Sequence, residues 1–352
     1  MSQSVHIVAV GARTPLGLTA ETSMAAVRFG ITQVNDHPFI VDRVANPVRL
    51  ALDSQLDPGL MGPQRLVEMA ATAIEEIYIQ FEGLLSRFTS VPVLLGLPEE
   101  RPGWSETNMQ MVRDELSQKL ASQQLDIYPH GHAAGLMALI VACARIKTGQ
   151  TEICIVAGVD SYLQSETLQW LDENKQLATS YHRGAFFPGE GAGACLLASE
   201  SVVNRFNLHS MARIRGGGEA KEAHIIKTGK ICLGDGLTEC VRKAVDPLVL
   251  PHEIVEGIIC DINGERYRSE EWGFSLLRVS QVFVDPTDYE APASCWGDVG
   301  AASGPLFIVL AVTAAVKGWA KGKRYLIWCS SEGGQRAALM LELNLQVGGE
   351  FL

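Results

Sequence analysis

Two histidines stand in a short polar turn, YPHGHAAG, that runs directly into an apolar segment. A reactive side chain at the mouth of a buried helix is typical of enzymes, so His132 is a candidate general base or transient acyl acceptor. The positive end of a helix disfavours a charged imidazole, and we therefore expect His132 to be neutral. The alternative is structural: a neutral histidine that caps the helix and hydrogen-bonds to its neighbours.

The same pair of histidines could hold a metal ion. His130 and His132, at positions i and i+2 of a turn, can share an ion if Asp298 or Cys295 supplies a third ligand. No other spacing of ligand residues supports such a site. We therefore expect neither a metal nor another cofactor.

The elements that must position this turn occur twice along the chain. Gly131–Gly149 and Gly297–Gly322 each begin with a glycine-rich turn, continue as a helix that is apolar on nearly every face, and stop at a glycine before a buried strand. A helix that is apolar all round must lie at the centre of a protein, and continuously apolar strands belong to sheets covered on both faces. The sequence therefore predicts a layered α/β/α/β/α fold with two apolar helices between two sheets.

The repeat also predicts how the chain is divided. We expect two pseudo-symmetric halves, 1–200 and 201–352, with the seam in a helical segment near Ala198–His209. The two apolar helices, which begin near Ala133 and Ala302, should be the most buried helices of the chain.

Composition narrows the possible classes of function. The chain has 352 residues, 47% of them hydrophobic, which is enough for one large core or two fused cores. Its net charge of −11 argues against nucleic-acid binding. The longest apolar run, Pro305–Val316, is too short to span a bilayer, and the N-terminus lacks a signal-peptide pattern. Eight scattered cysteines without a CxxC pair fit a reducing compartment, so we expect a cytoplasmic protein with no membrane partner.

Several motifs, taken in order, make the whole chain resemble a known superfamily. VHIVAVGARTPLG, GQTEICIVAGVDSYL and FFPGEGAGACLL resemble the first strand, the central strand and the PGEGAGA motif of the thiolase superfamily, and within it of the β-ketoacyl synthases of fatty-acid and polyketide synthesis. DINGER, CWGDVGAASG and SSEGGQRAALML fall on that family's His-Gly-Thr, Gly-His and GFGG segments. The resemblance implies the thiolase-type layered fold, and acyl thioesters as the substrate class of an active member.

The positions that carry catalysis in that family are replaced in this chain. His132 falls on the nucleophilic Cys, Asn263 and Asp298 fall on the two catalytic His residues, and Glu332 falls on the Phe that gates the pocket. The family's Lys falls near Ala293. Because an imidazole cannot replace the thiolate that forms the acyl thioester, the resemblance implies a ketosynthase-like protein that has lost this catalysis.

Charged residues occupy the loop that enters the active-site mouth in that family, here NGERYRSEEWG. We interpret Glu265, Arg266 and Arg268 as an ion-pair plug or a docking patch; the alternative is a solvated surface loop. Together with His130 and Glu332, they complete the predicted pocket. Carboxylates at its end predict that the acyl tunnel is closed or wet, since an apolar tunnel would desolvate them at a large cost.

The family usually pairs, so we expect a homodimer or a heterodimer with a homologous subunit. Trp104, in the Pro-rich loop LPEERPGWSETN, is expected to be exposed and to contact the partner; the alternative is an ordinary connection between a strand and a helix. Nothing predicts a nucleic-acid partner.

Two functions stay open at this point. The leading hypothesis is a catalytically inactive accessory or adaptor protein. Its resemblance to ketosynthase-like members of bacterial gene neighbourhoods links it to type VI secretion, with a secreted effector as partner. The alternative is an acyl-thioester enzyme or a partner subunit of a ketosynthase in fatty-acid or polyketide synthesis, with an acyl-carrier protein as partner.

Overall fold

Strands dominate the centre of the molecule. The computed structural model describes residues 4–120 and 124–345. Within these ranges, the central strands are β1 (Val5–Arg13), β4 (Val93–Leu97), β5 (Leu125–Pro129), β6 (Ile153–Ser161), β7 (Glu190–Ser199), β8 (Ala212–Lys221), β9 (Gly257–Cys260), β10 (Tyr289–Glu290), β11 (Arg324–Ser330) and β12 (Gln335–Leu343). They form one sheet in the order β10-β9-β11-β12-β8-β1-β7-β6-β4-β5.

The sheet consists of two five-stranded parts with matching order. In each part, two adjacent strand pairs are parallel, β5–β4 and β4–β6 in one, β10–β9 and β9–β11 in the other, and antiparallel strands follow toward the middle. The parts meet where β1 pairs with β8 over three residue pairs, from Val5 opposite Ile214 to Ile7 opposite Ala212. The two predicted sheets are thus one hydrogen-bonded sheet with a short junction.

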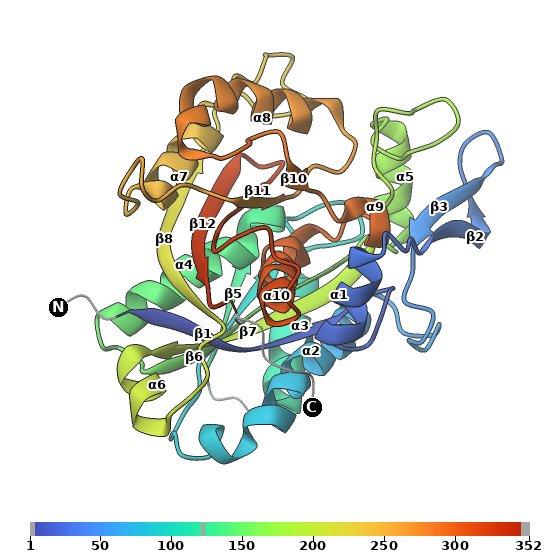
Figure 1. The fold of residues 1–352 in the computed structure, drawn as a ribbon. Helices are drawn as coiled ribbons and strands as arrows, with labels where there is room; N and C mark the ends of the chain where they lie inside the picture. Colours follow the sequence, from blue (N-terminus) through green and yellow to red (C-terminus); the bar gives the residue numbers. More distant parts are fainter. Residues whose placement is uncertain (1–3, 121–123, 346–352) are drawn as a thin grey trace.

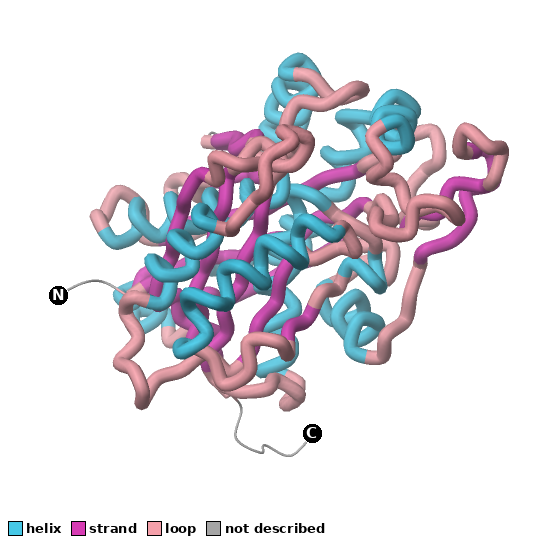
Figure 2. Tube along the Cα trace, turned by 90° about the horizontal axis from the view of Figure 1, so that it is seen from above, coloured by secondary structure: helices cyan, strands magenta, loops and turns pink. Residues whose placement is uncertain are grey.

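Two helices lie between the two parts of the sheet. α4 (Ala134–Lys147) contacts β4 and β6 of one part and β8 and β12 of the other, while α10 (Ser303–Val316) contacts β6 and β7 as well as β11. Outer helices cover the remaining faces: α2 (Gly62–Leu85) and α3 (Glu106–Lys119) on one side, α7 (Asp235–Val245) and α8 (Arg266–Val279) on the other. Figure 1 shows α10 in the middle of this arrangement, and Figure 2 shows helices packed over the strands. The α/β/α/β/α layering is confirmed.

The two central helices differ in burial. Every residue of α10 from Ser303 to Ala315 is buried, as predicted. α4 is buried along one face only; Met137 and Val141 are half-buried and Ala144 is exposed. The expectation that both helices are the most buried is therefore wrong for α4, because the described residues cover one of its faces only in part.

Glycine allows the two central helices to approach each other closely. A Cβ added to Gly135 of α4 would lie 2.3 Å from Cδ of Pro305 in α10. Such a contact requires a shift of one helix, so the absence of a side chain at Gly135 fixes how tightly the centre packs.

Smaller elements complete the chain. They are α1 (Ala20–Arg28), α5 (Ser165–Glu173), α6 (Glu200–Phe206, between β7 and β8), α9 (Ala293–Trp296), and the 3-10 turns η1 (Gly131–Ala133), η2 (Ser280–Val282) and η3 (Gly300–Ala302). β2 (Val34–Val41) and β3 (Pro47–Ala51) form a separate hairpin that extends from the body (Figure 1). No helix in the described part of the chain is long and apolar enough to cross a membrane.

Trp104 corrects one prediction. Its side chain packs in the core with Met109 and Val112 of α3 and is only 2% exposed, so it cannot contact a partner subunit. The Pro-rich loop around it connects β4 and α3.

Candidate functional site

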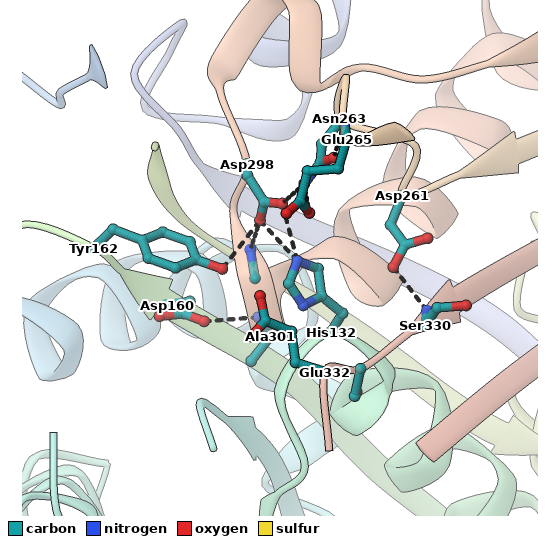
Figure 3. Close-up of polar contacts among 12 residues, drawn as sticks. His132, Asp160, Tyr162, Asp261, Asn263, Glu265, Asp298, Ala301, Ser330 and Glu332 are labelled. Atoms are coloured by element: carbon teal, nitrogen blue, oxygen red, sulfur yellow. Dashed lines mark hydrogen bonds and ion pairs between the residues drawn. The ribbon is translucent and has the colours of Figure 1, made fainter. Parts of the chain in front are cut away.

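Three turns bring the predicted site residues together. His132 lies in η1, directly before α4. Asn263 lies between β9 and α8, and Asp298 lies between α9 and η3. These turns are far apart in the sequence, yet Figure 3 shows their side chains converging on Asp298. The sheet order places β9 and β11 side by side, which brings the turn after β9 next to the starts of both central helices.

The Asp298 carboxylate is the hub of the site. Its oxygens lie 2.9 and 3.0 Å from His132 Nε2. It also accepts hydrogen bonds from Asn263 Nδ2 at 2.6 Å, from the Gly300 N–H at 2.8 Å and from the Tyr162 hydroxyl at 3.3 Å. Asp298 and His132 are only 3% and 6% exposed. The carboxylate is thus fully committed to protein donors.

The electrostatics of the pair favour the charged imidazolium. Burial by itself would lower the pKa of His132, but the facing Asp298 carboxylate more than offsets it, and the pKa is raised above its usual value. Burial would raise the pKa of Asp298, but His132, Arg268 and Asn263 hold it well below its ordinary range. The sequence analysis expected the helix end to favour a neutral His132, and it did not consider the carboxylate opposite, which shifts the pKa in the other direction.

A buried arginine forms the second part of the site. Arg268 donates through Nη1 to Asp261 Oδ2 and to the Ser330 carbonyl, both at 2.8 Å, and through Nε to Glu265 Oε2 at 3.1 Å. Its Nη2 lies 3.3 Å from His132 Nε2, which opposes the charge on the imidazole. Arg268 is 1% exposed. Glu265 and Arg268 therefore form a buried ion pair that fills the space beside His132.

Two of the predicted pocket residues lie elsewhere. The Arg266 side chain is 85% exposed and pairs with Glu270 on the surface of α8, so Arg266 does not belong to the site. His130 takes part through its backbone: its carbonyl accepts the Ser331 hydroxyl at 2.5 Å, and that hydroxyl oxygen in turn accepts the Ala133 N–H at 2.9 Å. Burial lowers the pKa of the His130 imidazole.

Glu332 lies at the mouth of the site. It accepts Gln176 Nε2 at 2.5 Å on one oxygen and Lys227 Nζ at 3.0 Å on the other. Burial would raise its pKa, but Lys227 and Gln176 hold the pKa below the usual value. Gln176 also donates to Glu265 Oε1 at 3.0 Å, so it connects the mouth with the buried ion pair.

A second carboxylate supports the start of α10. Asp160, at the end of β6, accepts the Ala301 N–H at 3.0 Å and the Arg101 guanidinium at 2.6 Å. The Arg101 guanidinium carbon lies 4.2 Å from the centre of the Tyr162 ring. A cavity of about 120 Å³ opens beside these groups; it is lined by Glu99, Glu100, Arg101, Gly131, His132, Asp160, Tyr162, Trp170 and Glu332.

The expected third metal ligands do not assemble around the histidines. In the described residues, one group of three potential ligand side chains has its atoms within 4.8 Å of one another, namely Glu222, Cys232 and Glu271. It includes neither His130 nor His132, and His132 already pairs with Asp298.

Sequence reasoning missed several members of the site. Asp160 and Tyr162 stand at the end of the apolar strand in GVDSY, where polar residues after a buried strand are a recognisable signal. Arg101 lies in a loop that we interpreted as a partner contact. Gln176 and Lys227 come from irregular segments in which no pattern marks them.

The fold can now be compared with known proteins. Residues 131–202, about a fifth of the chain, match the family "Beta-ketoacyl synthase, N-terminal domain". This segment carries His132, α4, β6 and β7, so the match includes the start of the central helix. No curated protein sequence matches the chain.

Solved structures match over nearly the whole length. The ishigamide ketosynthase/chain length factor has a TM-score of 0.81 at 15% identity, covering 98% of this chain and 100% of that one. A complex of a type II PKS acyl-carrier protein with its ketosynthase, AntDE:AntF, has a TM-score of 0.80 at 14% identity with the same coverage. The ketosynthase ApeO with its chain length factor ApeC from Xenorhabdus doucetiae has a TM-score of 0.78 at 16% identity, covering 97% of this chain and 98% of that one.

These likenesses define the class. The chain has the thiolase-type fold of the ketosynthases, with matching halves around two central helices. Its fold is therefore ketosynthase-like, and the segment that matches the family model begins at the start of the first central helix, which carries His132.

Proposed function

We propose that this chain is an accessory or adaptor protein that keeps the ketosynthase fold without its condensation chemistry. The observation that carries the proposal is the ion pair between His132 and Asp298. A nucleophile or general base needs a free lone pair. The facing Asp298 carboxylate raises the pKa of the His132 imidazole and so favours its protonated form, which has no lone pair to offer. The same start of α4 would favour a thiolate, which no described cysteine supplies at that position.

The walls of the cavity support the same conclusion. Glu99, Asp160 and Glu332 line it together with Arg101 and His132. An acyl chain placed here would desolvate these charges without replacing their lost interactions. A cavity of about 120 Å³ with such walls suits water and polar groups better than a growing hydrocarbon chain.

Assembly is part of the proposal. β5 is one of the two edge strands of the sheet, and in the described residues Met137 and Val141 of α4 are only half-buried. An uncovered strand edge next to apolar side chains suits pairing with another sheet. We propose that this face pairs with a second copy or with a homologous subunit.

Among accessory roles, we favour the handling of a secreted effector in bacterial type VI secretion. The support is the sequence resemblance together with a rigid fold whose site is filled by ion pairs. A rigid fold of this kind can bind a partner without a large loss of its own conformational entropy.

A second candidate is a partner subunit of an active ketosynthase. It is favoured by the likeness to structures of ketosynthases solved with chain length factors, since one such structure is the ApeO–ApeC complex. In this role the chain would pair with a homologous subunit and would still need no nucleophile of its own.

Affinity capture from the native host separates the two candidates. The tagged chain is compared with Val141→Lys, which charges the partly covered face of α4, and with Glu270→Lys on the exposed surface of α8 as the matched control. The adaptor role predicts capture of a specific partner that is neither a ketosynthase nor a carrier protein. Capture of a homologous ketosynthase, lost in Val141→Lys and kept in Glu270→Lys, supports the partner-subunit role; an acyl-carrier protein captured with tight acyl binding contradicts the adaptor role.

A further inference from the structure

The mouth of the cavity already holds one ammonium group. Lys227, in the loop between β8 and α7, lies with Nζ 3.0 Å from Glu332 Oε2 and 4.0 Å from the centre of the Trp170 ring. A carboxylate next to an aromatic face is the combination with which proteins bind cations. Glu332 and Trp170 both line the cavity, so this corner shows what kind of group its walls accept.

A second carboxylate in the same cavity has no cationic partner. Glu99 accepts the Gly333 N–H at 2.9 Å, but in the described residues no Lys, Arg or His side chain forms an ion pair with it. Burial raises the pKa of Glu99, and the nearby charge of Glu332 adds to the rise, while His132 works in the opposite direction. A cation placed beside Glu99 would offset both the burial of its carboxylate and the repulsion from Glu332.

The other charged side chains that line the cavity do not form an ion pair with Glu99. The Arg101 guanidinium is held by Asp160 at 2.6 Å, and the His132 imidazole by Asp298 at 2.9 Å. Each cation that faces the cavity is thus already paired with its own carboxylate. In the described residues, the carboxylates of the wall that form no ion pair are those of Glu99, which accepts the Gly333 N–H, and Glu100, which accepts the Glu106 N–H, so the unpaired charge is negative.

An unused hydrogen-bond acceptor belongs to Gln176, which contacts the cavity residue Glu332. Gln176 is 3% exposed and donates through its amide nitrogen to Glu265 and Glu332. Its buried carbonyl oxygen Oε1 has no hydrogen-bond partner in the described residues. A buried acceptor without a donor is costly, and an N–H group of a ligand would satisfy it.

We infer that this cavity binds one cationic group, the ammonium or guanidinium of a basic side chain, between Glu99 and the Gln176–Glu332 corner. The cavity of about 120 Å³ exists while Lys227 is in place, so the group can enter without displacing the lysine. Lys227 competes with it through its charge, since both cations share Glu332 and the Trp170 face. The inference deepens the proposed adaptor function, on which it rests for the source of the basic side chain: a partner polypeptide.

Calorimetric titration of the full chain with n-butylammonium tests the inference, with butyrate and n-butanol of similar size as controls at constant ionic strength. The wild type should bind n-butylammonium and neither control. Glu99→Gln keeps the shape and the acceptor for Gly333 N–H but removes the charge, and should bind about tenfold more weakly, because the ammonium loses a hydrogen bond to a charged group. Lys227→Ala should bind more tightly than the wild type, and Lys227→Arg should resemble the wild type.

Thermal unfolding of each variant checks that it is folded, and Glu270→Gln, on the exposed surface of α8, is the matched control that should leave binding unchanged. Equal binding of butyrate, no binding of n-butylammonium by either the wild type or Lys227→Ala, or unchanged binding by Glu99→Gln would each overturn the inference. These failures leave the adaptor proposal standing, since that proposal depends on His132 and Asp298. Conversely, turnover of acyl thioesters would refute the adaptor role without affecting the cation site.

Discussion

The starts of α4 and α10 have the same shape and opposite electrostatics. Each helix follows a 3-10 turn whose first residue is a glycine at positive φ, Gly131 at 62° and Gly300 at 46°. At α10, the Asp160 carboxylate accepts the Ala301 N–H, as the positive end of a helix favours. At α4, the side chain in the turn is His132, whose positive charge the helix end opposes.

The comparison shows why Asp298 matters. The start of α10 needs only a carboxylate, whereas the start of α4 carries an imidazole whose charged form is stabilised by Asp298, 2.9 Å away. Asp298 lies in the segment just before α10. The turn at the start of α10 therefore supplies the carboxylate that the turn at the start of α4 lacks. The site is therefore an electrostatic link between the two halves of the fold, and its charges are balanced without a substrate.

Removal of this carboxylate should have the largest effect. Asp298→Ala leaves the buried His132 imidazolium and the Asn263 amide without their acceptor, which should lower the free energy of unfolding by about 3–5 kcal/mol. Urea unfolding measures the change. Glu270→Ala removes an exposed ion pair with Arg266 and should change stability by less than about 0.5 kcal/mol. A loss no larger in Asp298→Ala than in this control would show that the pair is not a structural link.

A substitution at Gly300 probes the α10 side. A Cβ on Gly300 would lie 1.9 Å from Asp160 Oδ2, whereas Gly318, at a φ of 73°, has open space around it. Gly318→Ala should cost about 1 kcal/mol from backbone strain alone, and Gly300→Ala about 1–3 kcal/mol more, because Asp160 must also move. Thermal and urea unfolding of the two variants compare these losses. Equal losses would mean that the contact between Asp160 and the start of α10 carries no stability.

The pH dependence of stability should be the smallest effect. The pKa of His132 is raised in the folded state, so its contribution is fully present below the ordinary histidine pKa and is lost as pH rises through the raised value. The pKa of Asp298 is lowered, so its contribution is present above the ordinary aspartate pKa and is lost in acid. The pair therefore stabilises most between about pH 4 and 6.5.

Unfolding free energies of the wild type and Asp298→Asn, measured from pH 5 to 9, check this dependence. The difference between the two proteins should shrink as pH rises through the pKa of His132. A difference that stays constant or grows over this range would indicate a neutral His132.

The sequence predicted more of the fold than of the electrostatics. The repeat of a glycine-rich turn, an apolar helix and a buried strand predicted both central helices and the layers, because burial leaves a strong periodic signal. The repeat did not predict that α4 is exposed at Ala144, since a partly exposed apolar helix face has the same composition as a buried one. For the same reason Trp104 was placed on the surface although it lies in the core.

The site was predicted at the level of positions. His132, Asn263 and Asp298 were singled out by their place in the motifs, and the structure brings them within hydrogen-bonding distance. Their charges could not be predicted, because the state of His132 depends on a carboxylate 166 residues away. Arg268 lies inside the protein and Arg266 on its surface because their side chains point to different faces of α8. Which of the two points inward depends on the residue at which the helix begins.

The most direct test of the account asks whether His132 takes part in acyl chemistry. The purified wild type and His132→Ala are incubated with acetyl and malonyl thioesters, while thioester loss and the intact mass of the protein are followed. The account predicts no acyl adduct and no turnover above the level of His132→Ala, because the facing Asp298 raises the pKa of the imidazole and favours its charged form. An acyl adduct or turnover in the wild type that disappears in His132→Ala would contradict it.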